Sequence, residues 1–182
     1  MVGRRGQALA ASRRDREHDR RDGCQQVSVE GIVRIPLRRF ADERGWFCEL
    51  RRESLLPKPT VQTNVSTSRK GVIRGLHFHE RGQDDLFTCL QGTARVVVLD
   101  RNTGATYTED IGDENPVALY IPGRHAHGFE AITDLLFVYH VTEEYDPADP
   151  DEHGIAWDDP RVKDLWSTTN PILSARDTAA AF

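Results

Sequence analysis

Short β-rich runs separated by turn residues recur along most of this chain, and they constrain its fold more than any other feature. The segments VQTNVSTS (61–68), TARVVVLD (93–100), VALYIP (117–122) and LLFVYHV (135–141) combine β-branched and aromatic residues over lengths typical of strands. Turns rich in Gly, Pro, Asn and Asp separate the runs at spacings of roughly 8–12 residues, and helical periodicity is almost absent. The pattern predicts a mainly β protein, an antiparallel β-barrel or jelly roll with a few short helices.

The texture of the chain changes near residue 26. In residues 1–26 arginines alternate with Asp and Glu, and almost nothing is apolar, so we predict a disordered charged tail. A basic arm for an anionic partner is the alternative, although the interleaved acids cancel most of its field. Residues 27–182 carry the β-rich runs and are predicted to form a single domain with a substantial core.

Composition excludes several classes of function. The net charge of −5 gives no electrostatic reason to expect binding to nucleic acid. No apolar run approaches the roughly 18 residues of a membrane span, and the first residues lack the apolar core of a secretory signal. The cysteines, Cys24, Cys48 and Cys89, are odd in number and form no CxxC pair, which favours reduced thiols in a cytoplasm.

The segment from Gly71 to Gly92 carries charged and imidazole groups inside apolar sequence. Arg74, His77 and His79 lie among Val, Ile, Leu and Phe, where polar groups are costly unless they have partners or a function. The β-rich runs on either side of Gly92 predict a hairpin. A histidine-bearing strand that leads into a hairpin indicates a small-molecule site inside a β-barrel.

Histidines at matching spacing leave two kinds of chemistry open. His77 and His79 share one face of a regular strand, and His127 follows a Pro-Gly turn. These histidines are either proton-transfer and binding groups or, together with Asp84, ligands of iron, manganese or nickel. The second set resembles the two-part metal motif of cupin barrels, except that Asp84 stands where that motif usually has Glu.

A series of longer segments narrows the choice. These segments are DERGWF (42–47), QTNVSTS (62–68), GVIRGLHF (71–78), Gly92, IPGRHAHGF (121–129), VYHVTEEYDP (138–147), GIAWDDP (154–160) and LSARD (173–177). In this order, from about Val27 to Asp177, the chain resembles the dTDP-4-dehydrorhamnose 3,5-epimerase family, whose members epimerise nucleotide-linked 4-keto-6-deoxy sugars. The resemblance implies a cupin-like barrel that uses no metal or cofactor and forms a homodimer.

The resemblance also implies a proton-transfer mechanism. The C4 ketone acidifies the hydrogens on C3 and C5, so a base on one face and an acid on the other can invert either carbon. By match to the family, His77 is the base, Asp177 orients it, and Tyr139 is the acid. A His–Asp pair favours the imidazolium that forms when the base takes a proton.

The same match implies a set of substrate contacts. Arg44 and Arg74 match ligands of the diphosphate, and Phe47 and Glu49 match contacts to thymidine across a dimer interface. The remaining matches are Tyr145 near the nucleotide and sugar, His127 in the sugar pocket, and further contacts at Gln62, Asn64, Ser66 and His79.

Two features depart from the pattern of that family or of a regular strand. Where the family carries a lysine near the developing enolate, this chain has Asp85, and an acid there opposes the negative charge. Either Arg74 or a protonated His79 replaces the cation, or the reaction differs; if the cation is limiting, Asp85→Lys should raise activity. Strict alternation also places Arg74 and His77 on opposite faces, so a shared site requires a β-bulge, which we predict at Gly75.

The sequence leaves the natural dTDP-keto sugar open, together with the choice between C3 and C3 plus C5 and the role of the arginine-rich tail. Two alternatives to the epimerase also stand at this stage. One is a non-catalytic relative that binds a nucleotide sugar. The other is a metal-dependent cupin oxygenase or isomerase that uses His77, His79, Asp84 and His127.

Overall fold

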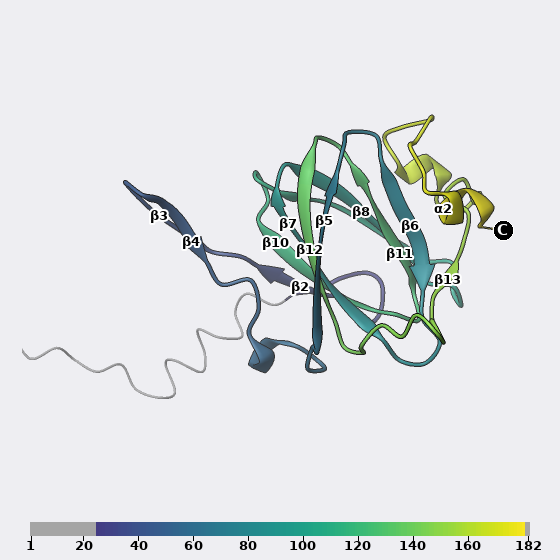
Figure 1. The fold of residues 1–182 in the computed structure, drawn as a ribbon, viewed down its shortest axis with the longest axis horizontal. Helices are drawn as coiled ribbons and strands as arrows, with labels where there is room; N and C mark the ends of the chain where they lie inside the picture. The colour runs from purple at the N-terminus through teal and green to yellow at the C-terminus, as the bar shows by residue number, and fades with distance from the viewer. Residues whose placement is uncertain (1–24, 181–182) are drawn as a thin grey trace, which may run out of the picture.

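The computed structural model describes residues 25–180, which form two facing β-sheets and a separate hairpin (Figure 1). The strands are β1 (Gln25–Gln26), β2 (Val33–Pro36), β3 (Arg39–Asp42), β4 (Gly45–Cys48), β5 (Gln62–Ser68), β6 (Ile73–Phe78), β7 (Asp84–Gln91), β8 (Thr93–Leu99), β9 (Thr106–Gly112), β10 (Val117–Pro122), β11 (Ala126–Ala131), β12 (Leu135–Val141) and β13 (His153–Gly154). The six-stranded sheet has the order β1-β2-β10-β7-β12-β5, and the five-stranded sheet the order β13-β6-β11-β8-β9. The predicted mainly β jelly roll is confirmed, as a two-sheet sandwich rather than a closed barrel.

Alternation along the strands divides the apolar side chains between two layers. In β8, Val96 and Val98 pack into the core between the sheets, whereas Val97 and Leu99 face the opposite side. The C-terminal segment covers that opposite side, with Trp166 among its buried residues. Because β8 is buried on both faces, its sequence is a continuous apolar run.

The predicted hairpin at Gly92 is wrong. The strands β7 and β8 on either side of it belong to different sheets, and β11 and β12 around Thr133–Asp134 are separated in the same way. The two crossings pack together: a Cβ at Gly92 would lie 2.3 Å from the carbonyl oxygen of Asp134. The chain therefore crosses from one sheet to the other at this turn. The local sequence of such a crossing does not differ from that of a hairpin.

The predicted bulge in β6 is confirmed. The pairing of β6 with β11 shifts register between the pairs His77↔His127 and Arg74↔Phe129, so β6 carries one extra residue there. Gly75 has φ +125, and a Cβ on it would lie 2.7 Å from Cα of Gly128. Glycine permits both the backbone conformation and the close approach.

Short helices complete the described residues. They are the 3₁₀ turns η1 (Glu53–Leu55) and η2 (Lys163–Leu165) and the α-helix α2 (Ala175–Ala179). An isolated bridge between Val72 and Ile172 holds the C-terminal segment near the start of β6, and α2 follows beside that strand (Figure 1). This placement brings the LSARD segment to the histidine strand.

The predicted tail lies outside the described residues, apart from Gln25 and Gln26, which pair with β2. Cys24 lies outside them as well. Within the part of the chain that the structure describes, no helix is both long and apolar enough to cross a membrane.

Candidate functional site

Two adjoining cavities open between the sheets. The inner cavity, of about 340 Å³, is lined by Arg74, His77, His79, Gln83, Asp85, Phe87, His127, Gly128, Phe129, Tyr139, Glu152, Ser174, Arg176 and Asp177. The outer cavity, of about 530 Å³, is lined by Gln62, Asn64, His79, Arg81, Gln83, Tyr139, Val141, Glu143, Glu144, Tyr145, Asp146, Asp149, Asp151 and Glu152. The two share His79, Gln83, Tyr139 and Glu152. Both sheets contribute walls, so the site is concave and largely preformed.

His77 and Asp177 meet on the inner cavity. Nε2 of His77 lies 2.7 Å from Oδ1 of Asp177, and the backbone N–H of Asp177 donates to the capping Ser174 hydroxyl. Burial raises the pKa of Asp177, but its hydrogen bonds and the charge of His77 lower it by more, so the net pKa is below the ordinary value. An ionised Asp177 is therefore placed to orient the imidazole and to favour its protonated form.

The β6 bulge brings Arg74 into the same cavity as His77, as the sequence required for a shared site. Its guanidinium donates to the Ser68 hydroxyl at 3.0 Å and to the Thr67 carbonyl at 3.1 Å. The side chain is exposed, so these bonds hold a cation at the cavity edge where a ligand can reach it.

Tyr139 points from β12 into both cavities. Its ring packs edge-on against Phe87, with centroids 6.1 Å apart. Burial is the largest cause that raises the pKa of Tyr139, and the carboxylates of Asp85 and Glu152 add to it. The phenol therefore keeps its proton at neutral pH, which suits a proton donor.

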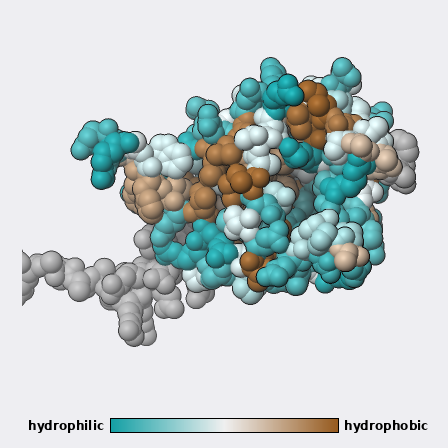
Figure 2. Space-filling view, in the orientation of Figure 1, coloured by the Kyte–Doolittle hydropathy of each residue, from teal (hydrophilic) through white to brown (hydrophobic). Residues whose placement is uncertain are grey.

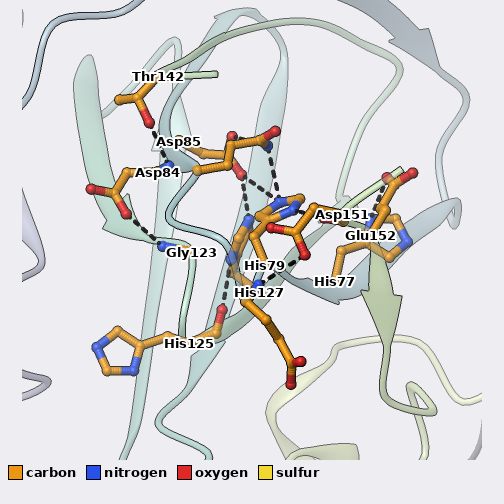
Figure 3. A network of polar contacts seen from close by, with 12 residues as sticks. His77, His79, Asp84, Asp85, Gly123, His125, His127, Thr142, Asp151 and Glu152 are labelled. Carbon is orange, nitrogen blue, oxygen red and sulfur yellow. Dashed lines mark hydrogen bonds and ion pairs between the residues drawn. The ribbon is translucent and has the colours of Figure 1, made fainter. Parts of the chain in front are cut away.

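Three buried side chains form a polar cluster on the inner cavity, and Figure 3 shows Asp85 between the rings of His79 and His127. Nε2 of His127 lies 2.6 Å from Oδ2 of Asp85, and Nε2 of His79 lies 3.6 Å from the same oxygen. Burial raises the pKa of Asp85, but the hydrogen bond from His127 and the nearby His79 ring outweigh it and lower the pKa far below the ordinary value. Asp85 is thus a buried carboxylate between two imidazoles.

The metal set predicted from sequence does not assemble. Asp84 is turned away from the cavity, and it accepts a hydrogen bond from the Gly123 N–H at 3.0 Å (Figure 3). It also accepts one from the Tyr120 hydroxyl at 2.6 Å. Lys58 pairs with it as well. Successive residues of a strand face opposite sides, so Asp85, and not Asp84, joins His79 and His127.

Gln62 and Asn64 line the outer cavity as predicted, and their side chains hydrogen-bond to each other at 2.8 Å. The backbone N–H of Tyr145 donates to Oε1 of Gln62, which places Tyr145 at the same cavity. Ser66 follows on the same face of β5, and its hydroxyl is buried with no hydrogen-bond partner among the described residues. It does not line either cavity.

Arg44, Phe47 and Glu49 do not reach these cavities. They lie on or just after the β3–β4 hairpin, which projects from the sandwich in Figure 1. Phe47 is 65% exposed, and the Arg44 guanidinium pairs with Asp42 at 2.5 Å. A single copy of the chain therefore leaves the predicted thymidine and diphosphate contacts of this hairpin outside the site.

Several lining residues were not predicted as site residues, among them Gln83, Asp85, Glu152 and Arg176 of the inner cavity. Asp85 was interpreted only as an opposing charge, and Gln83 stands two residues before it on the same face. Arg176 lies 2.9 Å from Nε2 of His77, and its position beside Asp177 is a signal that the sequence carries. Glu152 pairs with Arg176 and carries no local signal, because it lies in an acidic segment that resembles a solvated loop.

The fold and the paired cavities define a small-molecule enzyme of the cupin-like jelly-roll class. A family profile described as dTDP-4-dehydrorhamnose 3,5-epimerase matches residues 26–182. The chain is 38% identical over 149 residues to the spore coat polysaccharide biosynthesis protein SpsL of Bacillus subtilis, covering 77% of this chain and 97% of that protein.

Two solved structures share the fold and about 30% of the sequence. NovW of Streptomyces spheroides, a 4-keto-6-deoxy sugar epimerase, has a TM-score of 0.79 at 31% identity and covers 87% of this chain and 86% of its own. A dTDP-6-deoxy-D-glucose-3,5-epimerase of Legionella pneumophila, solved with dTDP-4-keto-L-rhamnose, has a TM-score of 0.79 at 30% identity, with coverages of 88% and 92%. The chain belongs to the dTDP-4-dehydrorhamnose 3,5-epimerase family and is an isomerase.

Proposed function

We propose that this chain inverts C3, C5 or both in a dTDP-linked 4-keto-6-deoxyhexose, in the biosynthesis of rhamnose or a specialised deoxysugar. The observation that carries the proposal is that a His–Asp pair and a buried tyrosine line one cavity of about 340 Å³, a volume suited to a single sugar ring. The substrate class is supported by two structural relatives: NovW is a 4-keto-6-deoxy sugar epimerase, and the Legionella epimerase was solved with dTDP-4-keto-L-rhamnose.

His77 takes the proton from a carbon beside the ketone, and the electrons of the broken C–H bond move to the C4 oxygen as an enolate. Tyr139 then gives a proton to the opposite face of that carbon, the ketone re-forms, and solvent restores both residues. Asp177 holds His77 in place and stabilises its imidazolium. The chemistry consists of proton transfers alone, so it requires no redox cofactor.

The outer cavity takes the nucleotide in this proposal. Gln62, Asn64 and Tyr145 line it, and Arg74 lies at the edge of the inner cavity, where its guanidinium suits a diphosphate. His127, which lines the inner cavity, is assigned to the sugar side, and Ser66, which lines neither cavity, is given no contact. The diphosphate thus spans the shared residues between the two cavities.

A homodimer completes the site in this proposal. The projecting hairpin would carry Arg44, Phe47 and Glu49 to the outer cavity of a second copy. The exposure of the hairpin side chains supports this, with Trp46 at 51% and Phe47 at 65%. Figure 2 shows further apolar surface in the middle of the view, near β5, where Val65 is 66% exposed.

We propose the cytoplasm as the location of this protein. The free thiols of Cys48 and Cys89 fit such a reducing compartment.

Proton NMR of dTDP-4-keto-6-deoxyglucose in deuterated water, with chelator-treated protein, tests the function. Loss of the C3 signal, the C5 signal or both is expected and identifies the carbon. No exchange together with tight binding of the sugar nucleotide would indicate a non-catalytic relative. No exchange and no binding would overturn the substrate class.

A further inference from the structure

The hydrogen bonds of His127 define its protonation state. Nδ1 lies 2.8 Å from the carbonyl oxygen of His125, and Nε2 lies 2.6 Å from Oδ2 of Asp85. A carbonyl and a carboxylate only accept hydrogen bonds, so both ring nitrogens of His127 donate. We therefore infer that His127 is the imidazolium partner of Asp85.

His79 differs in having one nitrogen that is not committed. Its Nδ1 faces the carbonyl oxygen of Asp151, so that nitrogen carries a proton. Nε2 is 3.0 Å from the Gln83 amide nitrogen and 3.6 Å from Asp85, too far for a hydrogen bond to the carboxylate. The same amide nitrogen donates to Oδ1 of Asp85 at 3.1 Å, so Gln83 is held as a donor and Nε2 of the resting His79 accepts from it. When His79 is protonated, its Nε2–H needs an acceptor other than Gln83, and a ligand oxygen in the cavity can provide one.

The surroundings of His79 favour its protonated form. Burial lowers its pKa, but the carboxylates of Asp85 and Asp151 and the backbone contact to Asp151 raise it by more. The His127 ring, 5.8 Å away, is the opposing cation. His79 can thus hold a positive charge beside the space that Tyr139 also lines.

The short contact between Asp85 and His127 is that of a hydrogen bond and does not fit a metal centre. Two ligands that each lie about 2.0–2.1 Å from one ion are about 3 Å or more apart. Asp85 and His127 are 2.6 Å apart, so they would have to separate before both could bind an ion. The buried carboxylate is instead satisfied by His127 and by the Gln83 amide at 3.1 Å.

The proposed epimerisation places negative charge on a ketone oxygen, and a preorganised donor at such an oxygen is worth about 10²–10³ in kcat. The two arginines of the inner cavity are placed for other contacts: Arg74 for the diphosphate and Arg176 for Glu152 and His77. Arg74 is bonded to Ser68 and Thr67 at the cavity edge, and Arg176 is paired with Glu152. The imidazole cluster is the buried source of positive charge that remains on this wall.

We propose that the His79–Asp85–His127 cluster is the electrophilic wall of the inner cavity, where His79 donates a hydrogen bond from Nε2 to the ketone oxygen as it becomes an enolate. Asp85 and His127 are positioning residues. The Asp85 carboxylate lies beside both rings and favours a positive charge on His79, and its hydrogen bond with His127 fixes the position of the carboxylate. The inference rests on the proposed function, because it assumes that an enolate forms.

The resting protein provides a test that does not depend on turnover. Long-range proton–nitrogen NMR of chelator-treated, ¹⁵N-labelled protein reports the protonation of each imidazole nitrogen. We expect His127 to carry both protons at pH 7–8 and His79 to titrate, with Asp85→Asn leaving His127 with one proton. A His127 ring that is neutral in the wild type overturns the inference, as does one whose state is unchanged in Asp85→Asn.

Kinetics test the catalytic part. His79→Gln and Asp85→Asn should each lower kcat for deuterium exchange by about 100-fold, with KM changed by less than about threefold. Exchange should fall as pH rises through the His79 pKa, and Asp85→Asn should move that alkaline limb to lower pH. Asp84→Asn, which removes the neighbouring buried acid, is the matched control: it should lower the melting temperature but keep the wild-type pH profile.

Three results would overturn the proposal. They are wild-type kcat and pH profile in Asp85→Asn, the same limb shift in Asp84→Asn, and a stoichiometric metal whose removal abolishes exchange. A wild-type protein that binds the sugar nucleotide but exchanges no deuterium overturns the proposed function itself. The NMR protonation pattern would then still report whether the cluster is cationic, so the two failures are distinguishable.

Discussion

His77 of β6 and Asp177 of α2 are 100 positions apart, and their side chains meet at 2.7 Å on the wall of the inner cavity. The contact exists because the C-terminal segment packs on the outer face of the five-stranded sheet and returns along β6. The proposed base is thus oriented by the last described helix.

Replacing Asp177 by Asn should lower kcat for exchange by about 10²-fold or more, because the neutral amide no longer stabilises the imidazolium. The folded-state pKa of Asp177 is lowered, so its contribution to stability is present above the unfolded value of 3.8 and is lost as pH falls through the lower folded value. Chemical denaturation of both proteins at several pH values checks this. A stability difference that grows toward acid pH would contradict the assignment.

His77→Ala should abolish deuterium exchange, whereas Tyr139→Phe should slow epimerisation more than the first exchange. The reason is that abstraction needs the base, while inversion also needs a proton on the opposite face. Product analysis alongside the exchange measurement separates the two steps. If both variants remain fully active, the assigned base and acid are wrong.

Asp85→Lys should lower both activity and stability. The sequence alone favours the opposite result, because a lysine would restore a missing cation. In the structure the replaced carboxylate is 3% exposed and lies between two imidazoles, so a lysine would leave cations without their anion and cost about 3–5 kcal/mol. Urea unfolding and the exchange assay measure the two effects, and a more active Asp85→Lys would show that a lysine serves the site better than the cluster.

Gly75→Ala should destabilise the protein and weaken the active site, because the added Cβ would meet Gly128 at 2.7 Å and the His127 carbonyl at 2.8 Å. Gly71→Ala is the matched control: it also has a positive φ, +84, but nothing lies within 4 Å of its Cβ. Gly71→Ala should cost about 1–2 kcal/mol of unfolding free energy, because an alanine is strained at this φ, and Gly75→Ala clearly more. Equal costs would mean that the close approach of β6 and β11 is not needed.

Arg44→Ala should raise KM for the nucleotide sugar by about tenfold, and Phe47→Ala should weaken dimerisation. Both follow if the hairpin of one copy enters the site of another, since a lost charged hydrogen bond costs roughly 1.5 kcal/mol. Sedimentation and steady-state kinetics provide the readouts. A monomeric protein with unchanged KM in Arg44→Ala would exclude the hairpin from the site.

Residue patterns along the chain were enough to predict the fold class, the family and one irregularity in a strand. The β-rich runs predicted the sheets, and the ordered segments identified the family. Arg74 and His77 are an odd number of residues apart, so a shared site required a bulge, and the register shift near Gly75 confirms it. These features can be predicted from sequence because they depend on residues that are close together in the chain: side chains alternate along a strand, and glycine permits backbone conformations that other residues avoid.

Contacts between residues far apart in the chain depend on the folded structure. The strands β7 and β8 lie in different sheets, although the turn at Gly92 has the local sequence of a hairpin. The turn at Gly92 packs against the turn at Asp134, far away in the sequence, and this contact accompanies the passage of both connections from one sheet to the other. The folded structure also reversed the interpretation of Asp85. In sequence Asp85 is an acid where a cation was expected, but in space it lies between two imidazoles. The effect of a charge depends on its distance to partners and on burial, and only the folded chain sets both.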